Sequence, residues 1–238
     1  MRTILITGGT SGLGFELAKL CYTKFNLVIC SSSDRRISNA KKYFEEINNS
    51  TDNILIEKCD VSDRNQVNIL YDKVIKKFNE INILINNAGI YSYNKILDSK
   101  ENELDKLFDI NFKGAYNTIK CTLPQMIEKQ EGIIVNVSST SVHNIFKGNS
   151  LYAASKAALE ILSNTLREEV RNHNIKVINF IPGAIATEIW SEENLQKYSN
   201  KMIQPQDAAK VLYSSIIHSL ENKVAIENIN INPINGSL

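Results

Sequence analysis

The amino-acid sequence predicts an α/β protein with a doubly wound parallel sheet of about seven strands and helices on both faces. Two observations lead to this fold class. Short runs rich in Ile and Val alternate with longer segments of helical period through almost the whole chain. No linker rich in Gly, Pro or Ser interrupts this alternation, and no internal repeat is visible. We therefore expect a single domain over residues 1–238.

The expected strands are apolar on both of their alternating faces. This pattern suits parallel strands that are covered by helices on both sides. The runs are Thr3–Thr7, Leu27–Ser31, Asn53–Lys58, Ile81–Asn86, Gly132–Val137, Ile175–Ile181 and Val224–Ile231.

The expected helices carry apolar residues at intervals of three and four. In the segment Asp63–Phe78, for example, Val67, Leu70 and Val74 form such a stripe, and Ser62 or Asp63 is a suitable N-cap. The expected helices are Ser11–Lys24, Ile37–Ile47, Asp63–Phe78, Asn102–Lys129, Ser150–His173 and Gln204–Ser219.

The composition is that of an ordinary globular protein. Hydrophobic residues make up 43% and charged residues 22%, and 27 Lys and Arg balance 26 Asp and Glu to a net charge of +1. This balance argues against a surface that binds nucleic acid. No secretory signal or long apolar run is visible, so we expect a cytoplasmic protein without a membrane segment. The four cysteines and three histidines lack metal-ligand spacing, so we expect reduced thiols and no metal site.

In doubly wound sheets, ligands bind outside the carboxyl ends of the strands. The first expected strand runs into a G-x-x-x-G-x-G turn that precedes a helix. Glycine lets the backbone turn sharply and approach a phosphate, and the helix N-terminus offers unpaired N–H groups. An ordinary Gly-rich turn is the alternative. The candidate cofactor-binding residues of this turn are Gly8, Thr10, Ser11, Gly12, Leu13 and Gly14.

Two further strand ends carry candidates for the adenosine half of a nucleotide. Asp60 and Val61 follow the third strand, where a carboxylate can accept a hydrogen bond from an adenine amino group; a helix cap is the alternative. Asn87, Ala88 and Gly89 follow the fourth strand, where small residues leave room for a ribose; a plain turn is the alternative.

Tyr152 and Lys156 give the strongest chemical signal. Their i, i+4 spacing on an expected helix places both side chains on one face. A phenol has an ordinary pKa of about 10, so acid–base work at neutral pH needs a shift of roughly three units, or about 4 kcal/mol. The Lys156 charge would supply part of this shift. Ser139, at the end of the fifth strand, could hydrogen-bond the same substrate oxygen; a helix that merely contains Tyr and Lys is the alternative.

In combination these motifs resemble the short-chain dehydrogenase/reductases, in their compact single-domain branch with a Rossmann fold. The resemblance extends from Ile4 to about Thr187, and the later helix and strand fit more loosely. The motifs that carry it are Thr7-Gly8-x-x-x-Gly12-x-Gly14, Asn86-Asn87-Ala88-Gly89, Asn111, Ser139, Tyr152-x-x-x-Lys156 and Pro182-Gly183 with Thr187.

The resemblance implies a role for each matching residue. Tyr152 would be the general acid/base, Lys156 would lower its pKa and hold the nicotinamide ribose, and Ser139 would orient the substrate oxygen. Asn111 would hold a water that links Lys156 to solvent, and it would also distort its long helix. The cofactor would carry out the hydride chemistry while the protein manages the proton. The residues expected to line the nicotinamide and the pyrophosphate are Pro182, Gly183, Ile185 and Thr187.

The end of the second strand distinguishes NADP from NAD. Members of the family that use NAD place Asp where this chain has Ser31 or Ser32, and neither position carries a carboxylate. The hydroxyls of Ser32 and Ser33, with charge from Arg35 or Arg36, could hold the additional phosphate of NADP.

Two residues in this region count against NADP. Asp34 lies close by, and Ser11 stands where many NADP users carry Arg or Lys in the glycine turn. A solvated helix start is the alternative interpretation of Arg35 and Arg36. On balance we expect NADP as the cofactor, with NAD as the less favoured alternative.

Substrate contacts are expected after the fourth, fifth and sixth strands. Each candidate could instead pack on its own loop. A short polar lid is expected over residues 188–203, where the family places a mobile lid. The candidate substrate-facing residues are Tyr91, Tyr93, His143, Phe146 and Trp190.

The end of the chain departs from the best-known family members, which finish in a Gly-rich run with an Asp. The segment Ile226–Pro233 has no such run, which disfavours a role in fatty-acid elongation and weakens the expected tetramer contact. The helices Asn102–Lys129 and Ser150–His173 resemble those that pair in family dimers. We expect a homodimer or homotetramer.

The sequence therefore predicts an oxidoreductase that transfers a hydride between NADP(H) and a small-molecule carbonyl or alcohol substrate. A catalytically silent nicotinamide-nucleotide-binding or regulatory protein of the same fold is the main alternative. Nucleotide-sugar epimerases and dehydratases also use Tyr-x-x-x-Lys, but those chains are longer and space their glycines differently. A serine hydrolase centred on Ser139 is disfavoured because the chain lacks a G-x-S-x-G motif.

Overall fold

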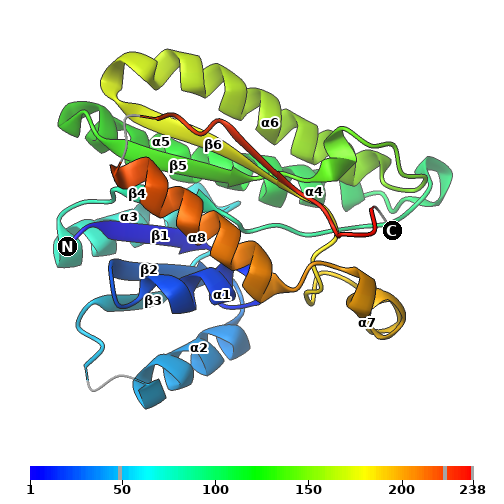
Figure 1. Cartoon of the computed structure of the whole chain (residues 1–238), viewed down its shortest axis with the longest axis horizontal. Coiled ribbons are helices and arrows are strands. Elements are labelled where there is room, and N and C mark those ends of the chain that lie inside the picture. The colour runs from blue at the N-terminus through cyan, green and yellow to red at the C-terminus, as the bar shows by residue number, and fades with distance from the viewer. Residues whose placement is uncertain (48–49, 222–223, 237–238) are drawn as a thin grey trace.

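The computed structural model describes residues 1–47, 50–221 and 224–236, within which the chain forms one sheet of seven parallel strands (Figure 1). The strand order is β3-β2-β1-β4-β5-β6-β7. The expected doubly wound parallel sheet is confirmed. The strands are β1 (Thr3–Thr7), β2 (Asn26–Ser31), β3 (Ile54–Lys58), β4 (Ile83–Asn86), β5 (Gly132–Val137), β6 (Ile175–Pro182) and β7 (Asn228–Ile231).

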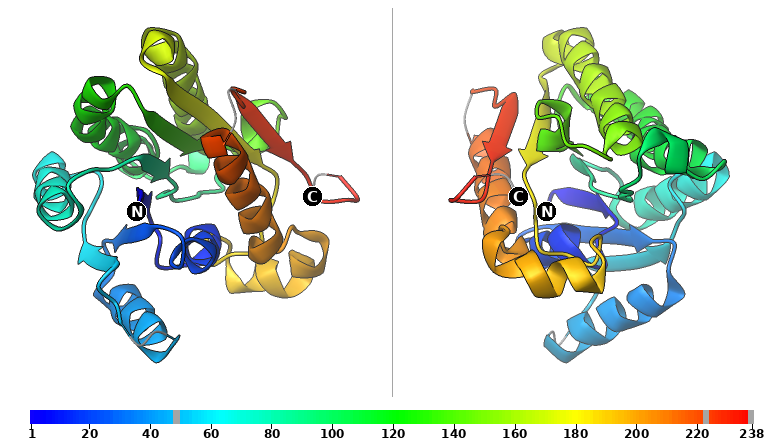
Figure 2. Two further views of the ribbon diagram at one scale, coloured as in Figure 1. Left: turned by 60° about the vertical axis from the view of Figure 1, so that its left-hand side comes forward. Right: turned by 90° about the vertical axis from the view of Figure 1, so that its right-hand side faces the viewer.

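Helices cover both faces of the sheet (Figure 2). The core beside α1, α2 and α8 contains Ile4 and Ile6 of β1, whereas Leu5 belongs to the core beside α3, α5 and α6. Successive side chains of one strand thus enter opposite layers, which explains why the strands are apolar on both faces. The helices are α1 (Gly12–Cys21), α2 (Asp34–Ile47), α3 (Arg64–Phe78), α4 (Glu103–Phe108), α5 (Gly114–Lys129), α6 (Ser150–Val170), α7 (Glu192–Tyr198) and α8 (Pro205–Glu221).

The single helix expected over Asn102–Lys129 is interrupted. A π-helical segment, Asp109–Lys113, separates α4 from α5. Asn111 lies in this segment and bonds through its side chain to both the N–H and the carbonyl of Ile90. The apolar period alone predicts one helix because it does not reveal a local change in backbone hydrogen bonding, whereas the distortion that the family resemblance implies at Asn111 is present in the π-helical segment.

The last strand is shorter than the apolar run Val224–Ile231 predicts. Of this run, the residues that pair with β6 as a strand are those of β7, Asn228–Ile231, and Val224 is 54% exposed. The Glu227 carbonyl, just before β7, accepts two hydrogen bonds, one from the Asn179 backbone N–H of β6 at 2.9 Å and one from the Arg167 side chain at 2.8 Å. An apolar run at the sheet edge therefore overstates the extent of the paired strand.

The order of the sheet reverses at β1. Its residue Ile6 lies between Ile29 of β2 and Ile85 of β4. The chain leaves β1 toward the face of α1 and leaves β4 toward the face of α5, so a crevice opens at the carboxyl ends of these two strands.

Two other expectations concern membranes and cysteines. Among the described residues, no helix is both long and apolar enough to cross a bilayer. Cys21, Cys30 and Cys59 are buried free thiols, whereas Cys121 is a partly exposed one. In the same described part of the chain, no three His, Cys, Asp or Glu residues gather in a way that could hold a metal ion.

Candidate active site

A cavity of about 1190 Å³ opens at the carboxyl ends of the strands. It exceeds the range of roughly 300–1,000 Å³ that is usual for small-ligand pockets. The expected site residues that line it are Gly8, Ser11, Gly12, Leu13, Ser32, Asp60, Val61, Asn87, Ala88, Gly89, Ser139, Tyr152, Lys156, Pro182, Gly183, Ile185 and Thr187. The expected site residues that do not line it are Thr10, Gly14, Ser33 and Asn111.

The glycine turn depends on two residues with positive φ. Gly8 has φ +62°, and a Cβ there would lie 2.9 Å from Ala88 Cα. Gly12 has φ +52°, and a Cβ there would lie 3.0 Å from Thr187 Cγ2. The N-cap of α1, Ser11, makes no side-chain capping hydrogen bond. The first N–H groups of α1 therefore remain available beside the cavity, as in helix termini that bind anions.

Gly14 has a packing role behind the wall of the cavity. A Cβ on it would lie 2.5 Å from Asn87 Nδ2 and 2.7 Å from the Gly8 carbonyl oxygen. Asn87 uses that amide nitrogen to donate to the carbonyls of Thr7, at 2.9 Å, and Gly8, at 3.1 Å. The end of β4 thus holds the glycine turn in place, and a side chain at position 14 would disturb it.

Tyr152 is partly buried and lies beside Ser139 at the opposite end of the cavity. Burial raises the pKa of Tyr152 to about 12; the hydrogen bond with Ser139 lowers it in part, and Tyr91 raises it further. This direction is opposite to the lowering that the sequence suggests. The reason is that the protein alone removes the phenol from water without placing enough positive charge against it.

Lys156 comes from the same face of α6 and is more deeply buried than Tyr152. Its Nζ donates to the Val137 carbonyl at 2.8 Å, and burial lowers its pKa to about 8. The end of β5 therefore fixes the position of the ammonium group. Val137 lies two residues before Ser139, so one strand end positions both the lysine and the serine.

Asn111 lies behind Lys156 in the π-helical segment. Its Nδ2 donates to the Ile90 carbonyl and to Ser155 Oγ, each at 3.0 Å. A Cβ on Gly89 would lie 3.1 Å from Asn111 Oδ1 and 3.3 Å from Lys156 Nζ. The absence of a side chain at position 89 therefore keeps a small space between the asparagine oxygen and the lysine ammonium group.

The end of β2 presents hydroxyls and one cation to the cavity. Ser31, Ser32 and Arg36 line it. Ser33 instead accepts a hydrogen bond from the Arg36 backbone N–H at the start of α2. Asp34 forms an ion pair with Lys58 at 2.6 Å and does not line the cavity.

Asp60 lines the cavity and does not cap α3. Its Oδ1 accepts hydrogen bonds from the backbone N–H and the hydroxyl of Ser62. The cap is Asp63, which accepts from the N–H groups of Asn65 and Gln66. Of the two N-cap candidates, Asp63 is confirmed.

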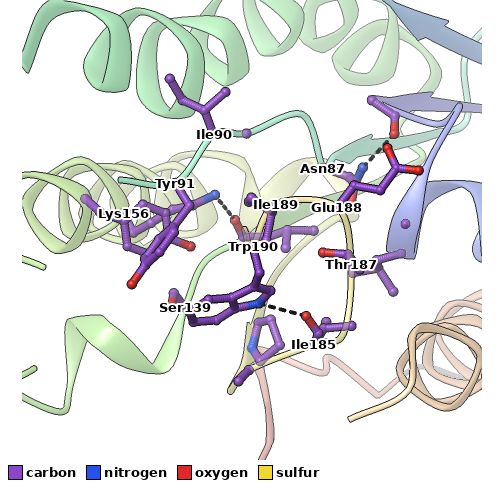
Figure 3. Close-up of a pocket in the computed structure, with 18 of the residues that line it drawn as sticks. Asn87, Ile90, Tyr91, Ser139, Lys156, Ile185, Thr187, Glu188, Ile189 and Trp190 are labelled. Carbon is purple, nitrogen blue, oxygen red and sulfur yellow. Dashed lines mark hydrogen bonds between the residues drawn. The ribbon is translucent and has the colours of Figure 1, made fainter. Parts of the chain in front are cut away.

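Aromatic side chains lie beside Tyr152, and Figure 3 shows two from this group, Tyr91 and Trp190. The ring of Tyr91 packs edge-on against Tyr152 at 5.0 Å between centroids and lies 4.8 Å from the Trp190 ring. Trp190 donates from its ring nitrogen to the Ile185 carbonyl at 2.9 Å. Tyr93 and Phe146 also line the cavity. This end of the cavity therefore has mostly apolar walls.

One of the substrate-facing candidates from the sequence lies outside the cavity. Several residues that do line the cavity were not among the candidates. His143 pairs with Glu160 at 3.0 Å and does not line the cavity. Asn149 does line it, and accepts a hydrogen bond from the Tyr91 hydroxyl at 2.9 Å. The feature of the sequence that could have indicated Asn149 is its position just before α6. The C-terminal residues Asn235 and Gly236 also reach the wall, which no local pattern indicates.

The fold and the cavity at its switch point are those of the nucleotide-binding doubly wound α/β proteins. The chain belongs to the short chain dehydrogenase family, whose sequence model matches residues 2–198.

Its relatives are named as oxidoreductases. An uncharacterized oxidoreductase of Staphylococcus aureus (strain MW2) is 27% identical over 234 residues, which are 98% of this chain and 97% of the relative. The uncharacterized oxidoreductase DltE of Bacillus subtilis (strain 168) is 34% identical over 192 residues, which are 78% of this chain and 72% of DltE.

Solved structures share the fold over nearly the whole chain. The closed form of a serine dehydrogenase complexed with NADP⁺ has a TM-score of 0.89 at 22% identity, covering 100% of this chain and 97% of the other. ElxO with NADP bound has a TM-score of 0.84 at 27% identity, covering 98% of this chain and 97% of ElxO.

Proposed function

We propose that this protein is an NADP(H)-dependent oxidoreductase that interconverts a carbonyl compound and its alcohol, with Tyr152 as general acid/base. The observation that carries the proposal is that Tyr152 and Ser139 lie together on the wall of the cavity, where Tyr152 shares a helix face with Lys156. These groups gather at one end of a cavity whose other end is the glycine turn.

The residues present fit a dinucleotide. The positive-φ glycines leave a concave backbone surface that a Cβ at Gly8 would fill, and the start of α1 offers N–H groups to a pyrophosphate. Gly89 keeps space open beside Lys156, which would hold the nicotinamide ribose. Pro182, Gly183, Ile185 and Thr187 would line the other side of the cofactor. When bound, the cofactor supplies the hydride and, in its oxidised form, a positive charge near the phenol.

The chain's own groups would manage the proton. Because burial raises the pKa of Tyr152 to about 12, the phenol holds its proton at neutral pH and can donate it to a carbonyl oxygen that is being reduced. Ser139 would orient that oxygen. Lys156, with a pKa of about 8, keeps most of its charge at pH 7 and would favour the phenolate that remains. A water between Lys156 and Asn111 would return a proton from solvent.

Three features of the β2 end favour NADP over NAD. No carboxylate stands at Ser31 or Ser32, Arg36 offers a guanidinium, and Lys58 engages Asp34 away from the cavity. A guanidinium and hydroxyl groups suit a ribose 2′-phosphate. The structures of the serine dehydrogenase and ElxO, which contain NADP, agree with this choice.

The substrate end suits an apolar carbonyl compound, because aromatic rings form most of the wall around Tyr152. We further propose that residues 188–203 act as the lid over this substrate, since Trp190 lies directly beside Tyr91. One domain would then carry both cofactor and substrate sites. A homodimer or homotetramer and a cytoplasmic location complete the proposal.

Replacing Tyr152 with Phe tests the proposal. The variant Tyr152→Phe removes the proton donor while keeping the ring that packs against Tyr91. We expect turnover of a carbonyl panel with NADPH to fall by a factor of about 10² or more. NADPH binding, measured by the fluorescence of the bound cofactor, should stay within about twofold.

The matched control is Tyr116→Phe, which makes the same change at a partly exposed position on α5 outside the cavity. It should keep full activity. Full activity of Tyr152→Phe would refute the role of the tyrosine. Tight NADPH binding with no turnover on any compound of the panel would instead support the catalytically silent alternative.

A further inference from the structure

A salt bridge crosses the rim of the cavity at the β2 end. Arg36, in the first turn of α2, donates from Nη2 to Oε2 of Glu188, the first residue of the 188–203 segment, at 2.8 Å. Both residues line the cavity. Figure 3 shows Glu188 beside Thr187, on the side away from Tyr91 and Lys156. The two side chains are 40% and 63% exposed, so a solute that enters the cavity can reach them.

The charges around this bridge are few. Among the described contacts, Glu188 is the one acidic partner of the Arg36 guanidinium. Asp34 is paired with Lys58 outside the cavity, and Ser31 and Ser32 carry no charge. Arg36 is therefore the cation that the β2 end offers to an anion, and a carboxylate of the same chain already occupies it.

A ribose 2′-phosphate and the Glu188 carboxylate need the same donors. The phosphate carries nearly two negative charges and three acceptor oxygens, so it can replace a carboxylate on a guanidinium. A ribose 2′-hydroxyl is neutral, so replacing the carboxylate on the guanidinium would add little to the binding free energy of the cofactor. Competition for Arg36 therefore affects the two nicotinamide cofactors differently.

We infer that Glu188 is a specificity-determining residue that competes with the cofactor 2′-phosphate for Arg36. The inference rests on the proposed function. In the free protein the carboxylate occupies the phosphate position on Arg36, and binding of NADPH breaks the bridge, whereas binding of NADH leaves it in place. Glu188 thus lowers the affinity for NADPH but not for NADH, and so reduces the difference between the two affinities. When the phosphate binds, the bridge no longer ties the 188–203 segment to α2.

Equilibrium binding of nucleotide fragments tests this without catalysis. The probes are 2′,5′-ADP, which carries the 2′-phosphate, and 5′-AMP, which lacks it, followed by NADPH and NADH. The variant Glu188→Gln keeps the shape of the side chain and removes its charge. We expect it to bind 2′,5′-ADP and NADPH about fivefold more tightly, the equivalent of one exposed ion pair, and to leave 5′-AMP and NADH unchanged.

Two further variants make the test specific. Glu192→Gln removes an exposed carboxylate from the same segment but outside the cavity, and should change none of the four affinities. In an Arg36→Gln background, the effect of Glu188→Gln on 2′,5′-ADP should disappear, because its target is gone. An effect that persists undiminished there, or one that Glu192→Gln reproduces, would overturn the inference. Wild-type protein that binds neither NADPH nor NADH would overturn the proposed function instead.

Discussion

Lys156 keeps its ammonium group where water hardly reaches it, and this has a thermodynamic consequence. Burial lowers the pKa of Lys156 from 10.5 to about 8, so the unfolded chain binds this proton more tightly than the folded protein does. Burial of the charged ammonium group lowers the free energy of unfolding, and this destabilisation is fully present below pH 8. It fades as the pH rises from 8 to 10.5, because the folded protein has then lost a proton that the unfolded chain still holds.

Replacing Lys156 with Met should therefore stabilise the fold at neutral pH. The shift in pKa corresponds to about 3 kcal/mol, and the Val137 carbonyl loses a donor worth about 1 kcal/mol. We expect Lys156→Met to raise the free energy of unfolding by about 2 kcal/mol at pH 7. Urea unfolding at pH 7 and at pH 10 measures this gain, which should shrink at the higher pH.

The control for this prediction is Lys120→Met, which removes a charge from an exposed position on α5. It should leave the unfolding midpoint unchanged at both pH values. A gain for Lys156→Met that did not depend on pH would mean that packing, rather than the buried charge, is responsible.

Most of the residues that gather at the candidate site could be predicted from the sequence, but the electrostatics of the site could not. The spacing of Tyr152 and Lys156 on a helix is a local feature, and Ser139 falls at a strand end that the apolar pattern reveals. The pKa of Tyr152 depends on burial and on Tyr91, which comes from the segment after β4. Only the folded chain brings these rings together.

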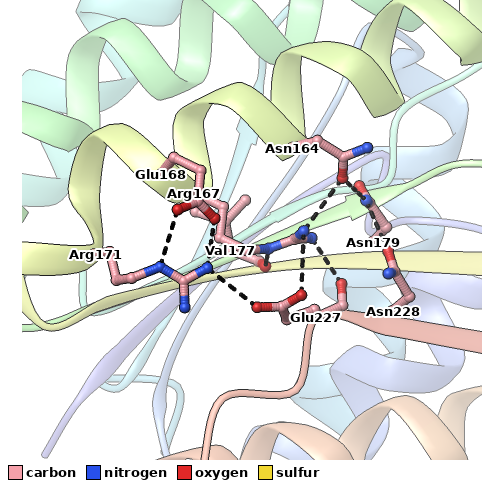
Figure 4. A network of polar contacts seen from close by, with 8 residues as sticks. All are labelled: Asn164, Arg167, Glu168, Arg171, Val177, Asn179, Glu227 and Asn228. Atoms are coloured by element: carbon pink, nitrogen blue, oxygen red, sulfur yellow. Dashed lines mark hydrogen bonds and ion pairs between the residues drawn. The ribbon is translucent and has the colours of Figure 1, made fainter.

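At the scale of elements, one arginine joins α6, β6 and the segment before β7 (Figure 4). Arg167 is 9% exposed, and it donates to the Val177 carbonyl at 2.9 Å and to the Glu227 carbonyl at 2.8 Å. Arg171, one turn further along, bonds only to the exposed carboxylates Glu168 and Glu227 within the network drawn. Arg167 thus connects backbone groups of different elements, whereas Arg171 pairs with exposed side chains.

The variant Arg167→Met should be strongly destabilising, because it leaves two backbone carbonyls without their charged donor. We expect the free energy of unfolding to fall by about 2–4 kcal/mol in thermal or urea unfolding. Arg171→Met is the matched control. Since exposed ion pairs contribute little, its unfolding midpoint should remain that of the wild type. Equal effects of the two substitutions would show that overall charge, rather than the buried contacts, anchors β7.

Elements whose boundaries depend on local chemistry were predictable. Asp63 caps α3 as an N-cap residue should, and β5 has the expected bounds. The π-helical segment and the short β7 were not predictable from periodicity. Both lie beside long-range contacts that periodicity does not reveal: Asn111 bonds to Ile90, and Arg167 bonds to Glu227.

At the scale of the whole molecule, the class of fold followed from the alternation of apolar and amphipathic segments, because parallel strands buried on both faces leave that pattern. What the alternation could not show is which loops meet at the switch point. The C-terminal residues Asn235 and Gly236 reach the cavity wall although they are far from the other motifs in sequence. Their position follows from the edge placement of β7, which is a property of the complete sheet.

Cofactor binding should stabilise the whole domain, because the cavity joins loops from both sides of the sheet. At a free NADPH concentration of 100 times Kd, the expected gain is about 2.7 kcal/mol, or roughly 5–10 °C in the unfolding midpoint. At the same concentration NADH should give a smaller shift. Differential scanning fluorimetry measures both. A larger shift with NADH would contradict the assignment of NADP.

The 188–203 segment starts and returns at one short bridge beside β6. Ile185 pairs with Ile203, the Ala186 N–H donates to the Ile203 carbonyl, and the Ile203 N–H donates to the Ala184 carbonyl, each bond at 2.9 Å. The ends of the segment are therefore fixed whatever lies between them. Because doubling the length of a closed loop costs only about 0.6 kcal/mol, this stretch can be lengthened or exchanged at little expense in stability. The bridge makes it an interchangeable module, through which the same scaffold could acquire a new substrate range while its nucleotide half stays unaltered.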